Sequence, residues 1–212
     1  EHIPLQYLTG SQEFMGMEFQ VTRDVLIPRQ DTERLVEEVL RCCSGKRVLD
    51  VCTGSGCIII SLAKLAKLKE AAGCDLSEKA LAVAGANAGK LGAQVRFFQS
   101  DMFSCVDGRY DIIVSNPPYI RSEDIDGLMP EVRCHEPRMA LDGGEDGLSF
   151  YRLIAGQAGQ FLVPDGRLYL EIGCDQAEAV SELLRQRGFR ELMVVKDYAG
   201  LDRVVTGTLG PS

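Results

Sequence analysis

Short apolar runs alternate with helical stretches from residue 46 onward, and this alternation most constrains the fold. Strands that alternate with helices favour a parallel sheet with helices on both faces. Two further apolar runs close the chain, which gives seven predicted strands: 48–51, 71–75, 95–98, 110–115, 167–172, 192–195 and 203–206. The sequence therefore predicts an α/β fold built on a seven-stranded sheet, and ligands of such sheets bind beyond the carboxyl ends of the strands.

The first 30 residues follow a different pattern. Residues 5–29 alternate apolar and polar positions, which predicts a β-hairpin with its turn near Met15-Gly16. Asp31 or Thr32 is expected to cap the helix that follows. The chain starts at Glu1 without an initiator Met. We therefore expect residues 1–30 to be a hairpin and linker that follow a missing N-terminal domain, and residues 31–212 to form the main domain.

Composition excludes some classes of function. The formal net charge is -8, which argues against tight nonspecific binding to nucleic acid. The eight cysteines contain no C-x-x-C pair and there are only two histidines, so we expect reduced thiols and no metal site. No apolar run approaches the length of a membrane span, and no signal peptide is evident. These features predict a cytoplasmic protein without a membrane partner.

A glycine-rich turn, Asp50-Val51-Cys52-Thr53-Gly54-Ser55-Gly56, follows the first strand of the sheet. Glycines let a backbone approach a ligand closely, and the next helix offers free N–H groups. The turn matches neither the dinucleotide pattern G-x-G-x-x-G nor a phosphate-binding P-loop. Asp50 at its start suits a ligand with a positive group instead. An ordinary tight turn between strand and helix is an equally good interpretation of this segment alone.

Two more acids follow strands. Asp75 ends the second strand, where a carboxylate can accept both hydroxyls of a ribose. It could instead cap the next helix, although Ser77 is available for that role. Turn and acid together indicate a nucleoside cofactor without a critical phosphate, and S-adenosylmethionine fits. Asp101 lies after the third strand, where it would meet the adenine amino group or remain a solvated loop residue.

Asn116-Pro117-Pro118-Tyr119 follows the fourth strand and is the most specific signal in the chain. The prolines fix φ and leave carbonyls without neighbouring N–H groups. The result is a stiff ledge of acceptors that suits a planar NH2 group, whose nitrogen would then face a methyl donor. Such a nitrogen is a weak nucleophile, so positioning must supply the catalysis. No strong base is evident near the segment. A rigid turn is the alternative interpretation.

The chain resembles the glutamine methyltransferases that modify peptide chain release factors. The resemblance spans nearly all of the sequence and rests on short motifs besides the turn and Asn116–Tyr119: 4–10, 13–16, 26–29 with 32–33, 136–137 with 140–141, 143–147, 171–173 with Gln176, 196–197 and 202–203. It implies a Rossmann-like, class I S-adenosylmethionine methyltransferase sheet in residues 31–212. It also implies that the missing N-terminal domain is helical and docks the release factor.

The resemblance implies a role for each predicted site residue. The cofactor would contact Asp50, Val51, Cys52, Thr53, Gly54, Asp75, Asp101, Met102 and Asn116, with Met102 and Leu26 on the adenine side or closing the pocket. The glutamine of a Gly-Gly-Gln loop would bind at Asn116, Pro117, Pro118 and Tyr119, of which Asn116, Pro117 and Tyr119 are the predicted catalytic residues.

Two alternatives remain open. Asn-Pro-Pro-Tyr is shared with methyltransferases of adenine and cytosine amino groups, so the acceptor could be adenine in DNA or RNA. The chain could also be a degenerate cofactor-binding scaffold, because Cys52 replaces a usual glycine in the cofactor turn. We expect the backbone at Cys52 not to need a positive φ, and its side chain to point away from the ligand.

Overall fold

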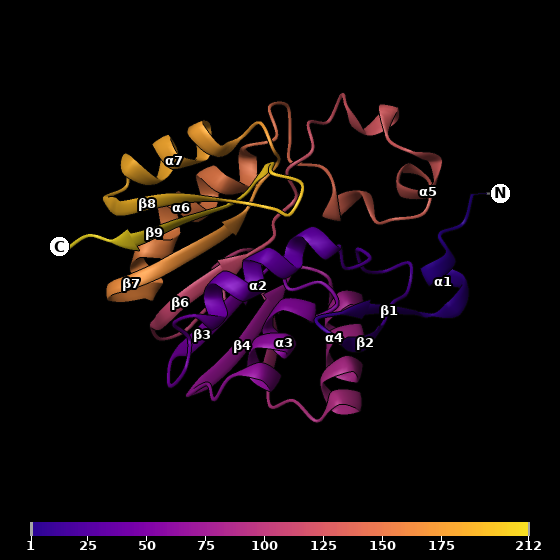
Figure 1. The fold of residues 1–212 in the computed structure, drawn as a ribbon, viewed down its shortest axis with the longest axis horizontal. Coiled ribbons are helices and arrows are strands. Elements are labelled where there is room, and N and C mark those ends of the chain that lie inside the picture. Colours follow the sequence, from indigo (N-terminus) through magenta and orange to yellow (C-terminus); the bar gives the residue numbers. More distant parts are fainter. Residues whose placement is uncertain (1, 212) are drawn as a thin grey trace.

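A seven-stranded sheet forms the centre of the molecule (Figure 1). The computed structural model describes residues 2–211, so residues 1 and 212, at the outer ends of the two predicted domains, lie outside the described residues. The strand order is β5-β4-β3-β6-β7-β9-β8. The strands are β3 (Arg47–Val51), β4 (Glu70–Asp75), β5 (Arg96–Gln99), β6 (Tyr110–Ser115), β7 (Leu162–Glu171), β8 (Phe189–Lys196) and β9 (Asp202–Leu209).

Helices cover both faces of this sheet, as predicted. Alternate residues of each central strand point to opposite faces, so Val48 and Ile112 enter one core while Leu49 and Ile113 enter the other. The first core packs against α2 (Glu33–Leu40), α3 (Cys57–Leu65) and part of α4 (Glu78–Leu91). The second packs against α6 (Ser149–Phe161) and α7 (Ala177–Arg185).

The sheet is mixed rather than fully parallel. Strands β3 to β7 pair in parallel, but β9 runs antiparallel to both β7 and β8. A parallel pair needs a long crossover, and only residues 197–201 separate β8 from β9. The two strands therefore form a hairpin, which the simple alternation rule cannot predict.

The N-terminal hairpin is shorter than predicted. Its strands are β1 (Ser11–Phe14) and β2 (Met17–Gln20), and the turn lies at Met15-Gly16 as expected, with φ of 51° and 70°. Residues Leu5–Thr9 form the short helix α1 instead of strand. The Gly10 backbone ends this helix in a left-handed conformation, with its N–H donating to the Gln6 carbonyl oxygen at 2.8 Å.

One buried amide joins the hairpin to the main domain. Asn87 of α4 accepts a hydrogen bond from the Gln20 N–H at 2.7 Å, and its NH2 donates to the carbonyl oxygens of Gln20 and Ser55 at 3.0 and 2.9 Å. Val21 and Val25 pack against α4 beside this amide. The hairpin is thus attached directly to the glycine-rich turn that contains Ser55.

One of the two predicted helix caps is not formed. Ser77 caps α4 as expected, since its hydroxyl accepts from the Ala80 N–H at 3.2 Å. Thr32 precedes α2 but makes no side-chain capping bond, and Gln176 at the start of α7 makes none either. Instead, Gln176 bonds the Gly173 N–H at 2.9 Å and the Tyr119 carbonyl oxygen at 3.0 Å. Contacts across the domain thus outweigh local capping at both helices.

The Pro- and Gly-rich segment 117–147 forms an irregular cover at the carboxyl ends of the strands, with η2 (Ile125–Gly127), α5 (Pro130–Arg133) and η3 (Arg138–Ala140) (Figure 1). Strand β6, which ends just before Asn116, and this cover both place residues near the predicted site.

Candidate functional site

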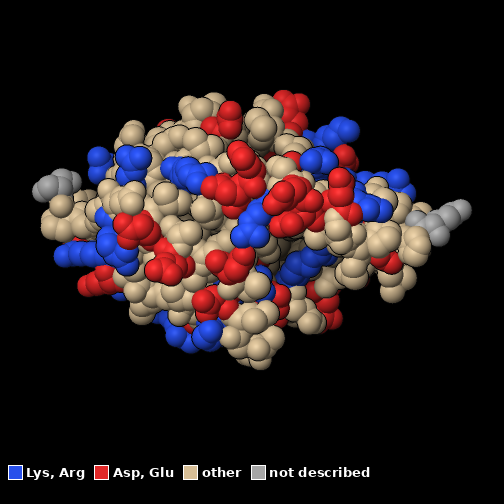
Figure 2. Space-filling view, turned by 90° about the horizontal axis from the view of Figure 1, so that it is seen from above, with Lys and Arg blue, Asp and Glu red and all other residues tan. Residues whose placement is uncertain are grey.

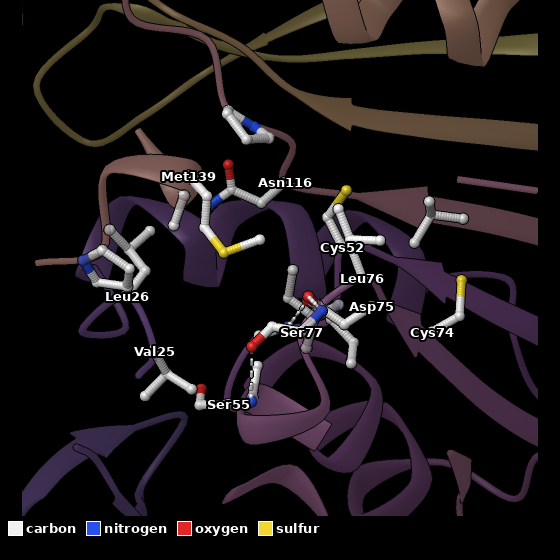
Figure 3. A pocket seen from close by; sticks show the side chains of 18 of the residues that line it. Val25, Leu26, Cys52, Ser55, Cys74, Asp75, Leu76, Ser77, Asn116 and Met139 are labelled. Carbon is white, nitrogen blue, oxygen red and sulfur yellow. Dashed lines mark hydrogen bonds between the residues drawn. The ribbon is translucent and has the colours of Figure 1, made fainter. Parts of the chain in front are cut away.

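A cavity of about 250 Å³ lies beyond the carboxyl ends of β3, β4 and β6 (Figure 3). Ten of the residues proposed from the sequence line it: Leu26, Val51, Cys52, Thr53, Gly54, Asp75, Asp101, Met102, Asn116 and Pro118. Asp50, Pro117 and Tyr119 do not. The structure therefore brings the predicted cofactor residues and Asn116 to one space.

Glycine is required in the turn between β3 and α3. Gly56 has a φ of 79°, and a Cβ atom there would lie 2.8 Å from Ile60 Cδ1. The Thr53 N–H donates to the Cys74 carbonyl oxygen at 3.0 Å, which binds the turn to β4. The turn is thus held against the neighbouring strand, and its Gly54 reaches the cavity wall.

Asp75 is held at the end of β4 by two backbone donors. The Gly54 N–H donates to Oδ2 and the Ser77 N–H donates to Oδ1, both at 2.9 Å. Burial raises the pKa of the carboxyl, and these two donors oppose the rise. The side chain is only partly buried, so its oxygens can still accept hydrogen bonds from a ligand in the cavity.

Asp50 lies underneath the turn instead of in the cavity wall. Its side chain is fully buried, and Oδ2 accepts from the Thr53 hydroxyl at 2.6 Å. Oδ1 is buried without a hydrogen-bond partner among residues 2–211. Burial raises the pKa of this carboxyl to about 7, the Thr53 hydroxyl opposes the rise, and the Asp75 charge adds to it. The Asp50 carboxyl therefore supports the turn from beneath through its hydrogen bond with Thr53.

Cys52 does not behave as the sequence predicted. Its backbone has a φ of 60°, in the left-handed region, and the residue lines the cavity while it packs against the core cluster that contains Met102. Met102 also has a positive φ, 50°, and its sulfur lies 4.0 Å from the Cys52 sulfur. The expectation of an ordinary φ at Cys52 was therefore wrong. A cysteine is accommodated here because its unbranched side chain tolerates the left-handed region better than a β-branched one.

Asn116 lies across the cavity from Ser55 and Ser77, with Met139 beside it (Figure 3). Its NH2 group donates to the Thr32 hydroxyl at 3.4 Å. The sequence indicated Thr32 as a helix cap and as part of a family motif, and the structure places it in the cavity wall. The motif pairing of Leu26–Arg29 with Thr32 was the one signal that it belongs to the site.

A buried carboxylate lies behind Asn116. Glu171 ends β7, its residue is 1% exposed, and the pKa of its carboxyl is raised to about 7 by burial. The sequence included Glu171 in a motif but indicated no base near the Asn116 segment. Sequence separation hides this neighbour, because the cover and helix α6 lie between β6 and β7 in the chain.

Tyr119 faces a different hollow. A groove of about 460 Å³ is lined by Tyr119 together with Gln6, Gln12, Ile27, Pro28, Arg29, Gln30 and Asp31. Pro28 and Arg29 also line the cavity, so the groove and the cavity share one wall. Pro117 is buried and lines neither the cavity nor the groove.

Glycines allow the cover to approach the Tyr119 backbone. A Cβ atom at Gly143 would lie 2.7 Å from Tyr119 Cα, and one at Gly147 would lie 2.5 Å from the Tyr119 carbonyl oxygen. The Gln176 side-chain NH2 donates to this same carbonyl oxygen. Close backbone packing of the two glycines and the hydrogen bond from the Gln176 amide therefore fix the Asn116–Tyr119 segment.

An ion pair between Arg29 and the buried carboxylate of Glu136 attaches the cover to the N-terminal segment. The Glu136 carboxylate accepts from the Ile27 N–H at 3.2 Å and from the Arg29 guanidinium. Its side chain is 1% exposed. The next residues of the cover, Pro137 and Met139, line the cavity. The pair therefore holds one side of the cavity closed.

Neither a metal centre nor a membrane span is found in the described part of the chain. No group of three or more His, Cys, Asp or Glu side chains within residues 2–211 is arranged to bind a metal ion. All eight cysteines are free thiols. No helix in that range has both the length and the apolar character to cross a bilayer.

Known proteins resemble this chain in fold and in sequence. A methyltransferase from Pyrococcus furiosus has a TM-score of 0.69 at 18% identity, covers 93% of this chain and 91% of its own, and shows the class I methyltransferase fold alone. The solved protein-(glutamine-N5) methyltransferase (release factor-specific) of Alicyclobacillus acidocaldarius is 32% identical, with a TM-score of 0.51 over 91% of this chain and 100% of that one.

Two comparisons establish the family. The Methyltransferase small domain family matches residues 30–145. A release factor glutamine methyltransferase of Geobacter sulfurreducens is 49% identical over 209 residues, covering 98% of this chain and 74% of that protein. The predicted class I methyltransferase fold and the predicted family are thereby confirmed: this chain belongs to the release factor glutamine methyltransferases.

Proposed function

We propose that this enzyme transfers a methyl group from S-adenosylmethionine to the side-chain amide nitrogen of the glutamine in the Gly-Gly-Gln motif of peptide chain release factors. The observation that carries the proposal is one cavity with a fixed carboxylate, Asp75, at one side and the Asn116 amide at the other. The family to which the chain belongs supplies the acceptor. The proposed site of action is the cytoplasm, where release factors act.

The residues of the cavity fit this cofactor. Its charged lining residues are four aspartates and one arginine: Asp24, Asp75, Asp101, Asp142 and Arg29. Such a lining suits a cation and disfavours the phosphates of a dinucleotide. S-adenosylmethionine supplies, when bound, a methyl group made electrophilic by the positive sulfur. Asp75 would hold its ribose, and the apolar side chains of Leu76 and Met102 would flank its adenine.

The acceptor residues fit a planar amide. Asn116 offers its Oδ1 as an acceptor while its NH2 is directed to Thr32. Pro117 and Pro118 stiffen the segment, and Gln176 holds the Tyr119 carbonyl. The chain thus orients a weakly nucleophilic NH2 group by hydrogen bonds, and the apolar cavity wall excludes water around it. Tyr119 in the adjoining groove would contact the polypeptide that carries the glutamine.

The surface weighs against a nucleic acid as the acceptor. Lys and Arg occur in separate groups among Asp and Glu on the face shown in Figure 2. The net charge of the whole chain is -8. Binding to nucleic acid depends on clustered positive charge that displaces counterions. We therefore propose a protein acceptor, without nucleic acid, membrane or metal as a partner.

Methyl transfer from S-adenosylmethionine to a purified release factor tests the proposal, with the modified residue located by peptide mass spectrometry. The expected result is one added methyl group on the glutamine of Gly-Gly-Gln. A release factor with that glutamine replaced by alanine is the control and should accept none. Transfer to an adenine-containing oligonucleotide, but not to the release factor, would contradict the proposal. Failure to bind S-adenosylmethionine in calorimetric titration would instead support a degenerate scaffold.

A further inference from the structure

Glu171 and Asn116 occupy neighbouring strand ends. Ser115 of β6 pairs with Leu170 of β7 in a parallel register, so the next residue of each chain segment, Asn116 and Glu171, emerges at the same edge of the sheet. Both β6 and β7 lie in the middle of the sheet (Figure 1). This arrangement places a carboxylate directly behind the residue that is proposed to hold the acceptor.

The Glu171 side chain is enclosed. The residue is 1% exposed, and Oε2 has no hydrogen-bond partner among residues 2–211. The Thr32 hydroxyl and the Asn116 amide both interact with the carboxylate in the sense that favours its ionised form. Thr32 in turn accepts from the Asn116 NH2 at 3.4 Å. Glu171, Thr32 and Asn116 therefore form one buried polar cluster.

Other charged and titratable groups face this cluster from every side. Arg203 of β9 lowers the pKa of Glu171, and Asp31 raises it. Arg203 forms ion pairs with two other carboxylates, since its Nη2 lies 3.0 Å from an Asp197 oxygen and 3.4 Å from an Asp31 oxygen. The neutral titratable groups that also feel the Glu171 charge are Cys57, Tyr119 and Tyr151. Burial outweighs these neighbours, and the carboxyl changes charge near neutral pH.

A side-chain amide can rotate by half a turn and exchange its oxygen and NH2 group. Only one of the two orientations of Asn116 gives an acceptor to the NH2 of a bound glutamine. A carboxylate behind the residue accepts hydrogen bonds only, so it selects the orientation in which the Asn116 NH2 faces inward. A protonated carboxyl carries a donor and loses this selectivity.

We propose that Glu171 is a positioning residue for methyl transfer: its carboxylate, with the Thr32 hydroxyl, fixes the Asn116 amide so that Oδ1 faces the acceptor nitrogen. This inference rests on the proposed function, because it assigns Asn116 the same role. It adds a pH dependence to that role. Glu171 is expected to act when ionised, so the alignment of Asn116 improves as the pH rises through about 7.

Nuclear magnetic resonance of the full chain, labelled with ¹⁵N and free of cofactor, tests the inference without any measurement of activity. The Asn116 side-chain NH2 signal is assigned by its absence in Asn116→Ala. It is expected to shift with pH with a midpoint near 7, the value to which the pKa of Glu171 is raised, and to lose this transition in Glu171→Gln. A wild-type signal that does not titrate near neutral pH would overturn the inference, as would an unchanged transition in Glu171→Gln.

Steady-state kinetics provide the second measurement. Glu171→Gln is expected to lower kcat by up to about 100-fold, the scale of a misplaced reacting group, while the Kd for S-adenosylmethionine stays the same. The rise of kcat through neutral pH should flatten in this variant. Glu38→Gln is a matched control, since Glu38 is a buried carboxylate of α2 that pairs with Arg34 and Arg41 away from the cavity.

The outcomes separate the inference from the proposed function. A wild-type protein that modifies no release factor contradicts the proposed function, whereas the Asn116 titration still decides whether Glu171 controls the amide. Equal losses of kcat and cofactor affinity in Glu171→Gln would indicate a merely structural role and overturn the inference.

Discussion

The sulfur atoms of Cys52 and Met102 lie 4.0 Å apart in the cavity wall, and both residues have left-handed backbones, with φ of 60° and 50°. Two non-glycine residues in this region at one contact are uncommon. Each costs on the order of 1 kcal/mol or more, and the surrounding structure holds them in place. Two of the six non-glycine residues with positive φ in the described chain therefore lie where the cofactor is proposed to bind.

This strain predicts how position 52 responds to substitution. Cys52→Val should lower the free energy of unfolding by about 1–3 kcal/mol, because a β-branched side chain fits poorly at positive φ. Cys52→Gly should not destabilise the fold, since glycine adopts this conformation freely. Urea unfolding measures the free energy of unfolding of both variants. Cys43→Val is the control, because Cys43 is buried at an ordinary φ; an equal loss there would remove strain as the explanation.

Asn116→Ala should separate binding from chemistry. We expect methyl transfer to fall by about 100-fold or more, the scale of losing a positioned polar contact, while S-adenosylmethionine binds nearly as before. Single-turnover kinetics and calorimetric titration measure the two properties. A parallel loss of cofactor affinity would contradict the assignment of Asn116 to the acceptor side.

Asp75→Ala should act in the opposite way. Loss of hydrogen bonds from a charged group would weaken cofactor binding by about 1.5–3 kcal/mol. The Gly54 and Ser77 N–H groups would also lose their acceptor, which adds to the effect. Asp101→Ala is the comparison, since Asp101 is exposed at the cavity edge and should weaken binding less. Calorimetric titration with S-adenosylmethionine measures the Kd of each variant, and a weaker effect of Asp75→Ala than of Asp101→Ala would contradict this assignment.

The buried carboxyls predict that stability falls as the pH rises. The pKa values of Asp50 and Glu171 are raised to about 7 from ordinary values of 3.8 and 4.5. Between about pH 4 and 7 the folded state therefore holds more protons than the unfolded state. As the pH rises through this window, each group lowers the free energy of unfolding by up to about 1.4 kcal/mol per pH unit. Above the window this loss of stability is complete.

Urea unfolding of the cofactor-free protein at several pH values measures this dependence. The decline between pH 4 and 7 should be shallower in Glu171→Gln, which has no charge to bury. A protein that becomes more stable over that window would contradict the raised pKa values.

The Glu136–Arg29 pair predicts a coupling between the cover and the N-terminal segment. Glu136→Gln should weaken the pair and expose segment 128–140 to faster hydrogen exchange, because Arg29 would lose the carboxylate that holds it against the cover. Hydrogen exchange with mass spectrometry reports this segment directly. Arg138→Gln is the control, since the Arg138 side chain lies on the same segment, pairs with Asp142 and is 63% exposed. Equal changes in both variants would argue against a specific role for Glu136.

The sequence predicts the fold well where local rules and tertiary contacts agree. The alternation of strands and helices predicts seven strands, and Ser77 caps its helix as local rules require. The rules fail at Thr32, because its hydroxyl accepts from the Asn116 NH2 and makes no capping bond to α2. The antiparallel β9 also escapes prediction, since a short link can join two strands without a helix.

The site is predictable to a similar extent. Residues at strand ends can be read from the sequence, so the cavity contains Asp75, Asp101 and Asn116. Residues that act across strands cannot be found in this way. Glu171 becomes a neighbour of Asn116 only through the β6–β7 register, which sequence spacing does not contain.

The side chain of Asn87 gives the N-terminal hairpin a mechanical connection to the chemistry. Its NH2 and oxygen are bonded to Gln20 on one side and Ser55 on the other. Tilting the hairpin would leave buried amide groups without partners, at about 1–3 kcal/mol for each. A load applied to the hairpin would therefore be transmitted to the turn around Ser55 before the two could separate.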